Sequence, residues 1–234
     1  YSRSFIPPTI TLQNYVDLGS KIPFFHEMWN SFVIAALVTI GQLLTCSMAA
    51  FCFAVVKFRF RNALFILLLV TFVIPFHVTL IPNFFIFRLL HLVGTTLPLW
   101  LPAVWGGTLA TFLLRQYFLT IPSELAEAAR IDGASLLQIF WKIYMPLARP
   151  ALAALAILTF MGSWNDLLHP LIYLPSDLQK TTIQVGLSLF QSQYSGKWTI
   201  MMAGTVASVA PMIVVFFLAQ KQFIEGIALS GVKR

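Results

Sequence analysis

Five long apolar segments constrain this chain more than any other feature of its sequence, because each is long enough to cross a lipid bilayer. A hydrocarbon layer of roughly 30 Å is crossed by about 20 helical residues. Four segments contain no charged residue, and the remaining one contains only Asp166. They cover residues 32–56, 63–87, 92–114, 150–175 and 198–220. The sequence therefore predicts an all-α, polytopic membrane helix bundle with five visible spans.

The basic residues are unevenly distributed between the two sides of this predicted bundle. Hydrophobic residues make up 59% of the chain and the formal net charge is +7. If the spans alternate and the turn at residues 57–62 faces the cytoplasm, ten basic residues lie inside and five outside, as the positive-inside rule expects. A nucleic-acid surface would gather them on one folded face. The basicity thus indicates orientation in a lipid bilayer and no nucleic-acid partner, with the N-terminus extracytoplasmic and the C-terminus cytoplasmic.

The spans divide one transmembrane domain, 1–234, into parts with different compositions. Residue 1 is Tyr rather than Met and falls outside the membrane, which indicates either processing or a further span upstream. The parts are an extracytoplasmic segment (1–30), three spans (31–119), a cytoplasmic loop (120–149), two spans with an outer loop (150–221) and a cytoplasmic tail (222–234). A short surface helix is expected in the outer loop near residues 185–190.

Proline and glycine predict irregular helices in the second and third spans. Pro75 and Pro82 each remove a backbone hydrogen bond, so a kink or an early end is expected near Ile81. Pro98, Pro102 and the pair Gly106-Gly107 predict an irregular outer end of the third span. In lipid, such backbone is tolerated only where other helices or a water-filled cavity cover the freed polar groups.

The loop 120–149 carries a compact pattern of small and charged residues. Pro122 and Ser123 provide a helix start, the string Glu127-Ala128-Ala129-Arg130-Ile131-Asp132-Gly133 follows, and Gly133 offers a left-handed position that ends the helix. Ile143 and Pro146 come ten and thirteen residues after this glycine. An apolar stripe is expected to anchor the second half of the loop to the bundle or the headgroups: Leu136, Leu137, Phe140, Trp141 and Tyr144. Alternatively, the loop is a solvated connector whose alanines merely favour helix.

This spacing, E-A-A-x3-G-x9-I-x-L-P with Met145 in place of Leu, resembles the EAA loop of permease subunits in bacterial binding-protein-dependent ABC importers. The resemblance implies docking on a separate ATPase through a coupling helix that contains Glu127, Ala128, Ala129, Asp132, Gly133 and Ala134. It implies a second homologous permease subunit, two ATP-binding subunits that hold ATP and Mg, and an extracytoplasmic solute-binding protein. It also implies a prokaryotic cytoplasmic membrane location, no cofactor on this chain, and a first span upstream of residue 1.

A second informative string, Gly162-Ser163-Trp164-Asn165-Asp166, lies in the outer half of the fourth visible span. An ionisable residue at membrane depth, such as Asp166, is a candidate functional group. Trp164 could stack on a sugar ring, Asn165 could bind its hydroxyls, and Gln42 on the first span could line the path. The alternatives are an interfacial anchor for Trp164, a headgroup or helix partner for Asp166, and a helix–helix hydrogen bond for Gln42.

The same string resembles the carbohydrate-uptake, maltose-type branch of these importers, as do Val185-Gly186-Leu187, Gln193-Tyr194 and Phe223-x-Glu225-Gly226. This resemblance implies a sugar, glycoside or polyol as the solute. His169 departs from the branch, which usually has an apolar or aromatic residue there. A non-sugar solute, or transport without an ATPase, remains an alternative; the latter predicts broken helices with ionisable groups at mid-depth.

Motifs of an enzyme are missing from the sequence. It contains no catalytic triad pattern, paired carboxylates or Walker A loop. Its four histidines have no neighbouring metal ligands at a suitable spacing. Cys46 and Cys52 are six residues apart on one helix and point to different sides, so a disulfide is not expected. We therefore expect a transport subunit without a catalytic site of its own and without a metal.

Overall fold

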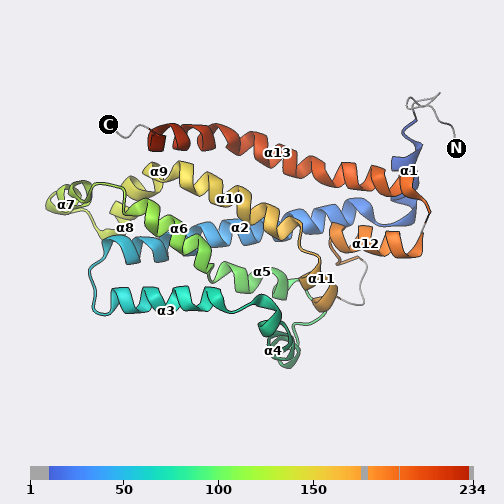
Figure 1. Cartoon of the computed structure of the whole chain (residues 1–234), viewed down its shortest axis with the longest axis horizontal. Coiled ribbons are helices and arrows are strands. Elements are labelled where there is room, and N and C mark those ends of the chain that lie inside the picture. Colours follow the sequence, from blue (N-terminus) through green and yellow to red (C-terminus); the bar gives the residue numbers. More distant parts are fainter. Residues whose placement is uncertain (1–10, 175–178, 195, 232–234) are drawn as a thin grey trace.

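The chain forms an elongated bundle of helices in this computed structural model, which describes residues 11–174, 179–194 and 196–231. Helices α2, α3, α10 and α13 run along the long axis; α7 lies at one end, and α1 and α12 lie at the other (Figure 1). Every regular element of the described residues is helical. The predicted all-α class is confirmed.

The helices follow one another with few residues between them, as connections within a bundle require. Their bounds are α1 Gln13–Lys21, α2 Phe24–Val55, α3 Arg61–Val73, α4 Phe76–Leu89, α5 Leu97–Val104, α6 Thr108–Phe118, α7 Ser123–Ile131, α8 Leu136–Ile139, a π-helix Phe140–Tyr144, α9 Met145–Leu147, α10 Arg149–Trp164, α11 Leu168–Tyr173, α12 Ile183–Gln193 and α13 Trp198–Gly231. The expected outer-loop helix is α12. The predicted tail continues α13 as far as Gly231.

Three stretches are long and apolar enough to cross a membrane, and two bent helix pairs raise the number to at most five in the described residues. The three stretches are Phe24–Val55, Leu97–Phe118 (α5 and α6 together) and Trp198–Phe217. The bent pairs are α3 with α4, at 94°, and Leu136–Leu147 with α10, at 78°. Four predicted segments overlap four of these units. The predicted segment 150–175 covers α10 and α11, whereas the bent pair joins α10 to residues 136–147, which the sequence assigned to the loop.

The break in the second span lies at Pro75 and not near Ile81 as the sequence suggested. Ile74 and Pro75 both have extended backbone, which separates α3 from α4. Proline disfavours the helical conformation in the residue before it, so Ile74 ends α3. Pro82 lies inside α4 without ending it. Pro75 thus produces the bend, whereas α4 continues through Pro82.

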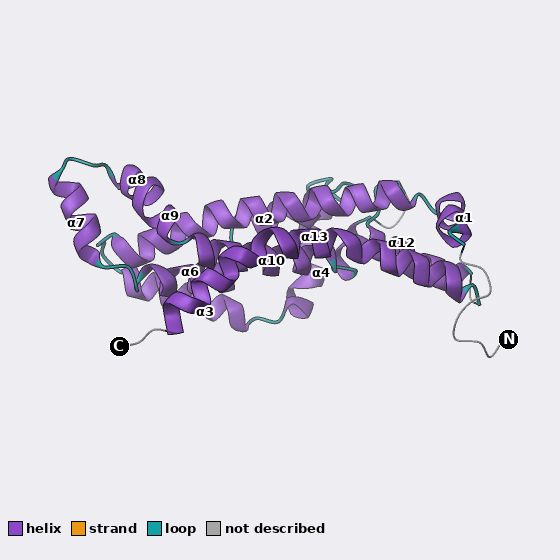
Figure 2. Cartoon of the chain, turned by 90° about the horizontal axis from the view of Figure 1, so that it is seen from above, coloured by secondary structure: helices purple, strands orange, loops and turns teal. Residues whose placement is uncertain are grey.

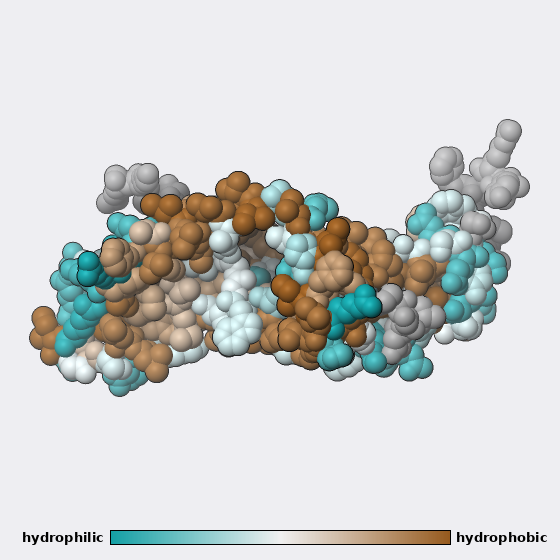
Figure 3. Space-filling model, turned by 90° about the horizontal axis from the view of Figure 1, so that it is seen from below, coloured by the Kyte–Doolittle hydropathy of each residue, from teal (hydrophilic) through white to brown (hydrophobic). Residues whose placement is uncertain are grey.

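Large apolar side chains cover much of the outer surface, especially on α3 and α4. Val73 is 78% exposed and Leu89 is 79% exposed. Figure 3 shows an apolar surface along the middle of the molecule, with hydrophilic residues gathered at both ends. A soluble monomer rarely exposes apolar patches of this extent. The surface therefore fits a bundle embedded in lipid or packed against another membrane subunit.

Helix α2 forms the centre of the bundle, and two buried clusters lie along it. At the α7 end, Phe51 of α2 packs on Phe140 and Tyr144 of the π-helix, with ring centroids 5.4 and 5.1 Å apart. Tyr144 also meets Phe118 of α6 edge to face at 5.4 Å. The second cluster, at the other end, joins α1, α2, α10, α12 and α13. The loop that carries α7 is thus attached to the core through aromatic rings.

Candidate functional site

The gap between α5 and α6 is supported by side chains of α2. Thr45 donates a hydrogen bond from its hydroxyl to the carbonyl of Val104 at 2.7 Å. The backbone N–H of Gly107 donates to the sulfur of Cys46 at 3.2 Å. Two polar groups freed by the break thereby find partners inside the bundle, as lipid-embedded backbone requires. The expected irregularity of this span is confirmed, and its protection comes from the first span.

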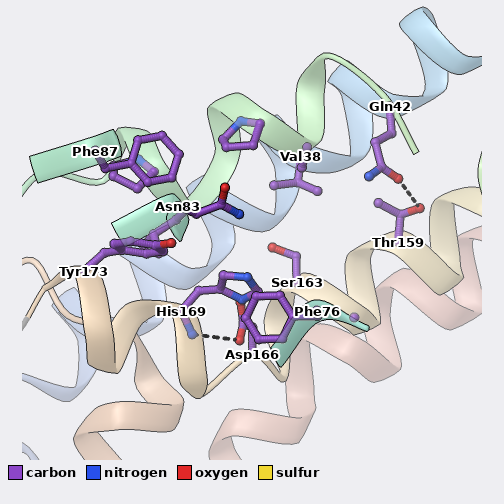
Figure 4. A pocket seen from close by; sticks show the side chains of 15 residues that line it. Val38, Gln42, Phe76, Asn83, Phe87, Thr159, Ser163, Asp166, His169 and Tyr173 are labelled. Atoms are coloured by element: carbon purple, nitrogen blue, oxygen red, sulfur yellow. Dashed lines mark hydrogen bonds and ion pairs between the residues drawn. The ribbon is translucent and has the colours of Figure 1, made fainter. Parts of the chain in front are cut away.

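A cavity of about 370 Å³ opens beside this break, between α2, α4, α5, α10 and α11. Figure 4 shows the side chains of Asn83, Ser163 and His169 pointing into the same space. Gln42 lies at the far end of the cavity, where its side-chain oxygen accepts a hydrogen bond from Thr159 at 3.4 Å. Polar groups from four helices therefore converge in a mostly apolar wall, the usual composition of a small-molecule site.

Asp166 and His169 form a fixed polar pair in the wall of the cavity. The Nδ1 atom of His169 lies 2.6 Å from Oδ2 of Asp166, and the backbone N–H of His169 donates to Oδ1 at 3.2 Å. The imidazole ring also packs on Phe76, with centroids 4.2 Å apart. Among the described residues that line the cavity, Asp166 is the one carboxylate and none is a Lys or Arg. The cavity therefore offers hydrogen-bond acceptors and aromatic surface, and no cation that is permanently charged.

The cavity is continued by a second one, of about 560 Å³. The two share Gln42, Phe76 and Thr159 in their walls. The second cavity reaches α3 and α6, where the hydroxyls of Thr71 and Thr108 are hydrogen-bonded at 3.0 Å. Polar groups thus mark a route from the C-terminal half of α10 toward the start of α6.

Of the four residues that the sequence proposed for a solute path, two lie in the wall of this cavity and two do not. Gln42 and Asp166 both line the cavity. Trp164 is only 1% exposed; it stacks on Phe160 at 5.7 Å and donates its indole N–H to the carbonyl of Ser208 at 3.2 Å. The proposed stacking of Trp164 on a sugar ring is therefore not supported by its position, because the ring serves the packing of α10 on α13.

Asn165 also lies away from the cavity, on the opposite side of the segment from Asp166. Its side-chain oxygen accepts a hydrogen bond from Gln184 of α12 at 3.4 Å. Helix α10 ends at Trp164, and successive residues at a helix end point in different directions. The string Gly162–Asp166 therefore contributes Gly162, Ser163 and Asp166 to the cavity wall and not its two central residues.

Aromatic residues of the cavity were not found from the sequence. Phe76, Phe87 and Tyr173 line it together with the polar groups. Tyr173 meets Phe87 edge to face at 5.3 Å. In a chain with 22 phenylalanines, no local pattern distinguishes a cavity ring from a lipid-facing one. Ser163 had a detectable signal, because it precedes Asp166 by three residues and so shares its helix face.

The proposed coupling helix is α7, which projects from one end of the bundle (Figure 2). It ends in a Schellman motif: Gly133 has a φ of 82°, its N–H donates to Arg130 at 3.0 Å, and the N–H of Ala134 donates to Ala129 at 2.9 Å. Ser135 and Gln138 then form a capping box at the start of α8. Two hydrogen-bonded caps in succession set the direction of α7 relative to the bundle.

One face of α7 packs on the core, and the other is free in this chain. Ala126 is buried, and Ala129 and Ala134 pack partly against the cluster at this end. Glu127, Ala128 and Asp132 are exposed. So are two large apolar residues that the motif did not indicate: Leu125, 44% exposed, and Ile131, 86% exposed. The free face thus combines apolar side chains with carboxylates.

The segment after α7 differs in part from the predicted apolar stripe. Phe140 and Tyr144 are buried as expected, together with Ile139. Leu136, Leu137 and Trp141 are exposed. Leu136 and Leu137 lie before the π-helical turn at Phe140–Tyr144, and Trp141 lies within it; their exposed side chains fit the contact with headgroups that the sequence also allowed. The aromatic anchor is therefore narrower than a regular amphipathic helix would provide.

Comparisons with known proteins agree on one family. Residues 41–228 match the family described as "Binding-protein-dependent transport system inner membrane component". The chain is 37% identical to the arabinooligosaccharides transport system permease protein AraQ of Halalkalibacterium halodurans, over 98% of this chain and 82% of that protein. It is 36% identical to the sn-glycerol-3-phosphate transport system permease protein UgpE of Yersinia pestis, over 89% and 74%.

A solved structure is similar to nearly the whole chain. It is a chain of a bacterial ABC transporter involved in the import of the acidic polysaccharide alginate, with a TM-score of 0.83 and 26% identity. The match covers 95% of this chain and 84% of that chain. The helix arrangement described above is thus that of an ABC importer permease.

Proposed function

Because this chain belongs to the family of inner membrane components of binding-protein-dependent transport systems, we propose that it is the permease subunit through which an ATP-driven importer passes a neutral sugar or polyol. Relatives named for arabinooligosaccharide transport support a sugar as the solute. The observation that carries the choice of a neutral sugar is the composition of the cavity wall.

The cavity suits a polyhydroxylated, uncharged molecule. Asp166 and the side-chain oxygens of Gln42, Asn83 and Ser163 can accept or exchange hydrogen bonds with hydroxyls. Phe76 offers an apolar ring to the face of a sugar. An anionic solute would meet the carboxylate of Asp166 with no Lys or Arg nearby, and a buried charge without a partner is strongly unfavourable. The wall therefore favours neutral solutes over phosphates and uronates.

Helix α7 is proposed to dock on an ATP-binding subunit through its free face. Glu127, Ala128, Asp132 and Gly133 come from the motif, and Leu125 and Ile131 add apolar area from the structure. A few residues near the centre of an interface commonly account for most of its affinity. ATP and Mg are bound by the partner subunits and supply the energy; this chain transmits movement.

The aromatic cluster provides the mechanical connection from α7 to the solute cavity. Phe140 and Tyr144 tie the loop to Phe51 of α2 and Phe118 of α6. Gln42 of α2 and Thr159 of α10 lie in the walls of both cavities. A shift of α7 would therefore displace the helices that enclose the solute. Transport then follows as a change in the populations of inward-facing and outward-facing states.

The same proposal includes the orientation of the chain in the membrane and the other subunits of the importer. The α7 end faces the cytoplasm of a prokaryotic cell, in agreement with the excess of basic residues there. A second homologous permease, two ATP-binding subunits and an extracytoplasmic solute-binding protein complete the importer. The apolar surfaces of α3 and α4 are available for lipid or for the second permease.

The test compares Asp166→Ala with Asn165→Ala in the complete importer reconstituted with its binding protein. Both variants remove one short polar side chain from the same turn, but only Asp166 lines the cavity. We expect Asp166→Ala to lower uptake of the sugar at least tenfold with unchanged ATPase co-purification, while Asn165→Ala transports normally. Normal uptake by Asp166→Ala would contradict the assignment of this cavity as the solute path.

A further inference from the structure

A separate pocket of about 360 Å³ lies at the turn between α2 and α3. It shares no lining residue with the solute cavity. The turn lies at the same end of the molecule as α7 (Figure 1). The residues that line the pocket are Lys57, Phe58, Phe60, Arg61, Asn62 and Ala63. Two cations and an amide thus face a pocket with aromatic walls.

The cations of this turn have no acidic partner. Among the described residues, no carboxylate lies within ion-pair distance of Lys57, Arg59 or Arg61. Arg115 of α6 adds positive charge nearby, close enough to Arg61 for the two to repel each other. Like charges held together without a counter-charge favour the binding of an anion.

Arg115 of α6 is held beside the turn by contacts with α2 and α3. Its Nε donates to the carbonyl of Phe53 at 3.1 Å, and its guanidinium lies 4.0 Å from the ring centroid of Phe65. Arg59, in contrast, lies over the ring of Phe60 at 4.8 Å and is not part of the pocket wall. The guanidinium of Arg115 therefore contributes positive charge at a fixed position beside the turn, in addition to the charge of the flexible surface side chains.

The surroundings of the pocket distinguish a lipid from a free anion. Phe58 is 40% exposed and Phe60 is 64% exposed, and the outward face of α3 continues with Ile66, Leu67 and Val70, all exposed. Aromatic and basic side chains next to an apolar face are typical of the headgroup level of a bilayer. A phospholipid whose phosphate group occupies the pocket would place its acyl chains along this face.

We propose that the α2–α3 turn binds the phosphate group of an anionic phospholipid, with Lys57 and Arg61 contacting the phosphate oxygens and Asn62 donating a hydrogen bond. Basic pockets beside membrane helices are suited to anionic headgroups. Such a lipid would neutralise the turn that connects the central helix α2 to the bent pair α3 and α4. The pocket is thus a lipid site in addition to the solute path.

The test titrates the delipidated, assembled importer with phosphatidylglycerol and measures bound lipid by native mass spectrometry. Arg61→Gln is expected to weaken binding at least tenfold, because charge-assisted hydrogen bonds to phosphate are lost. Arg59→Gln is the matched control: it removes one charge beside the pocket and should weaken binding about fivefold at most. Asn62→Leu keeps every charge, obstructs the pocket, and should also weaken binding.

Several outcomes would overturn the lipid site. Equal effects of Arg61→Gln and Arg59→Gln would show a general surface attraction, as would unchanged binding by Asn62→Leu. A parallel titration with inorganic phosphate identifies a free anion: tight phosphate binding that depends on Arg61, with unaltered phosphatidylglycerol binding, would refute the lipid. Loss of ATPase co-purification in Arg61→Gln at unchanged lipid binding would instead indicate a protein contact.

Discussion

Replacing Gly133 by Ala isolates the conformational role of the residue that ends α7. Gly133 has a φ of 82°, and a Cβ atom added to it would meet nothing within 4 Å. Steric collision with the rest of the chain is therefore absent. The effect of the substitution comes only from forcing an L-residue into the left-handed region, where the Schellman hydrogen bonds of Gly133 and Ala134 hold it.

The magnitude follows from two opposing contributions. The left-handed conformation of a non-glycine residue costs about 1–2 kcal/mol. Ala also reduces the conformational entropy of the open turn, which returns about 0.4–1 kcal/mol to the ordered state. The net loss is about 1 kcal/mol, which corresponds to about a fivefold smaller ratio of closed to open turn. If α7 docks only from the closed turn, the affinity for the ATPase subunit should fall in proportion to the fraction of closed turn that is lost, and therefore by no more than about fivefold.

Two measurements on the permease in nanodiscs check this value. Hydrogen exchange of the amides of Gly133 and Ala134 should accelerate about fivefold, and binding of the ATPase subunit should weaken by no more than the same factor. Gly133→Asn should lose less, because Asn tolerates the left-handed region. Gly19→Ala is the control, since Gly19 also has open space around it but no positive φ.

The reasoning would be refuted by either of two results. Unchanged exchange in Gly133→Ala would mean that the turn does not depend on the left-handed glycine. A loss of ATPase affinity well beyond fivefold would mean that Gly133 acts on the partner directly and not only through the turn.

Three further substitutions test other contacts. Gly41→Ala should destabilise the bundle by about 1–3 kcal/mol in thermal unfolding, because its Cβ would collide with Val104; Val104→Ala in the same chain should restore most of the loss, and no restoration would contradict the contact. Ile131→Glu should abolish ATPase co-purification with stability changed by no more than about 0.5 kcal/mol, since the side chain is 86% exposed; intact co-purification would remove Ile131 from the docking face. Trp164→Phe should lose about 1 kcal/mol of stability with its hydrogen bond to Ser208, yet sugar uptake by the folded fraction should be unchanged; altered solute preference would instead place Trp164 in the path.

Much of the fold was predictable because membrane spans are read from local composition. Four of the apolar segments correspond to the three single stretches and the bent pair of α3 and α4, and the segment 150–175 contains α10. The helix start at Ser123 and the left-handed Gly133 were both expected from short-range rules. The position of the bend at Pro75 was not, since Pro75 and Pro82 have the same local chemistry.

The candidate site was predictable only in part, for a related reason. Asp166 was conspicuous because a carboxylate is rare at membrane depth. Its partner His169 follows three residues later, in α11, whereas the ring of Phe76 joins the site from the start of α4, far away in the sequence. Trp164 carried an equally strong sequence signal, yet it faces α13.

The sequence by itself determined what depends on the solvent and on neighbouring residues. The bilayer demands about 20 apolar helical residues per span, charged loops orient them, and caps and glycines end the helices; the family motif at Glu127–Gly133 is likewise contiguous. Only the tertiary structure decided which side of each helix faces the cavity, the core or the lipid. In a chain where nearly every span residue is apolar, hydrophobicity does not distinguish these three environments, and the packing of one helix against another makes the choice.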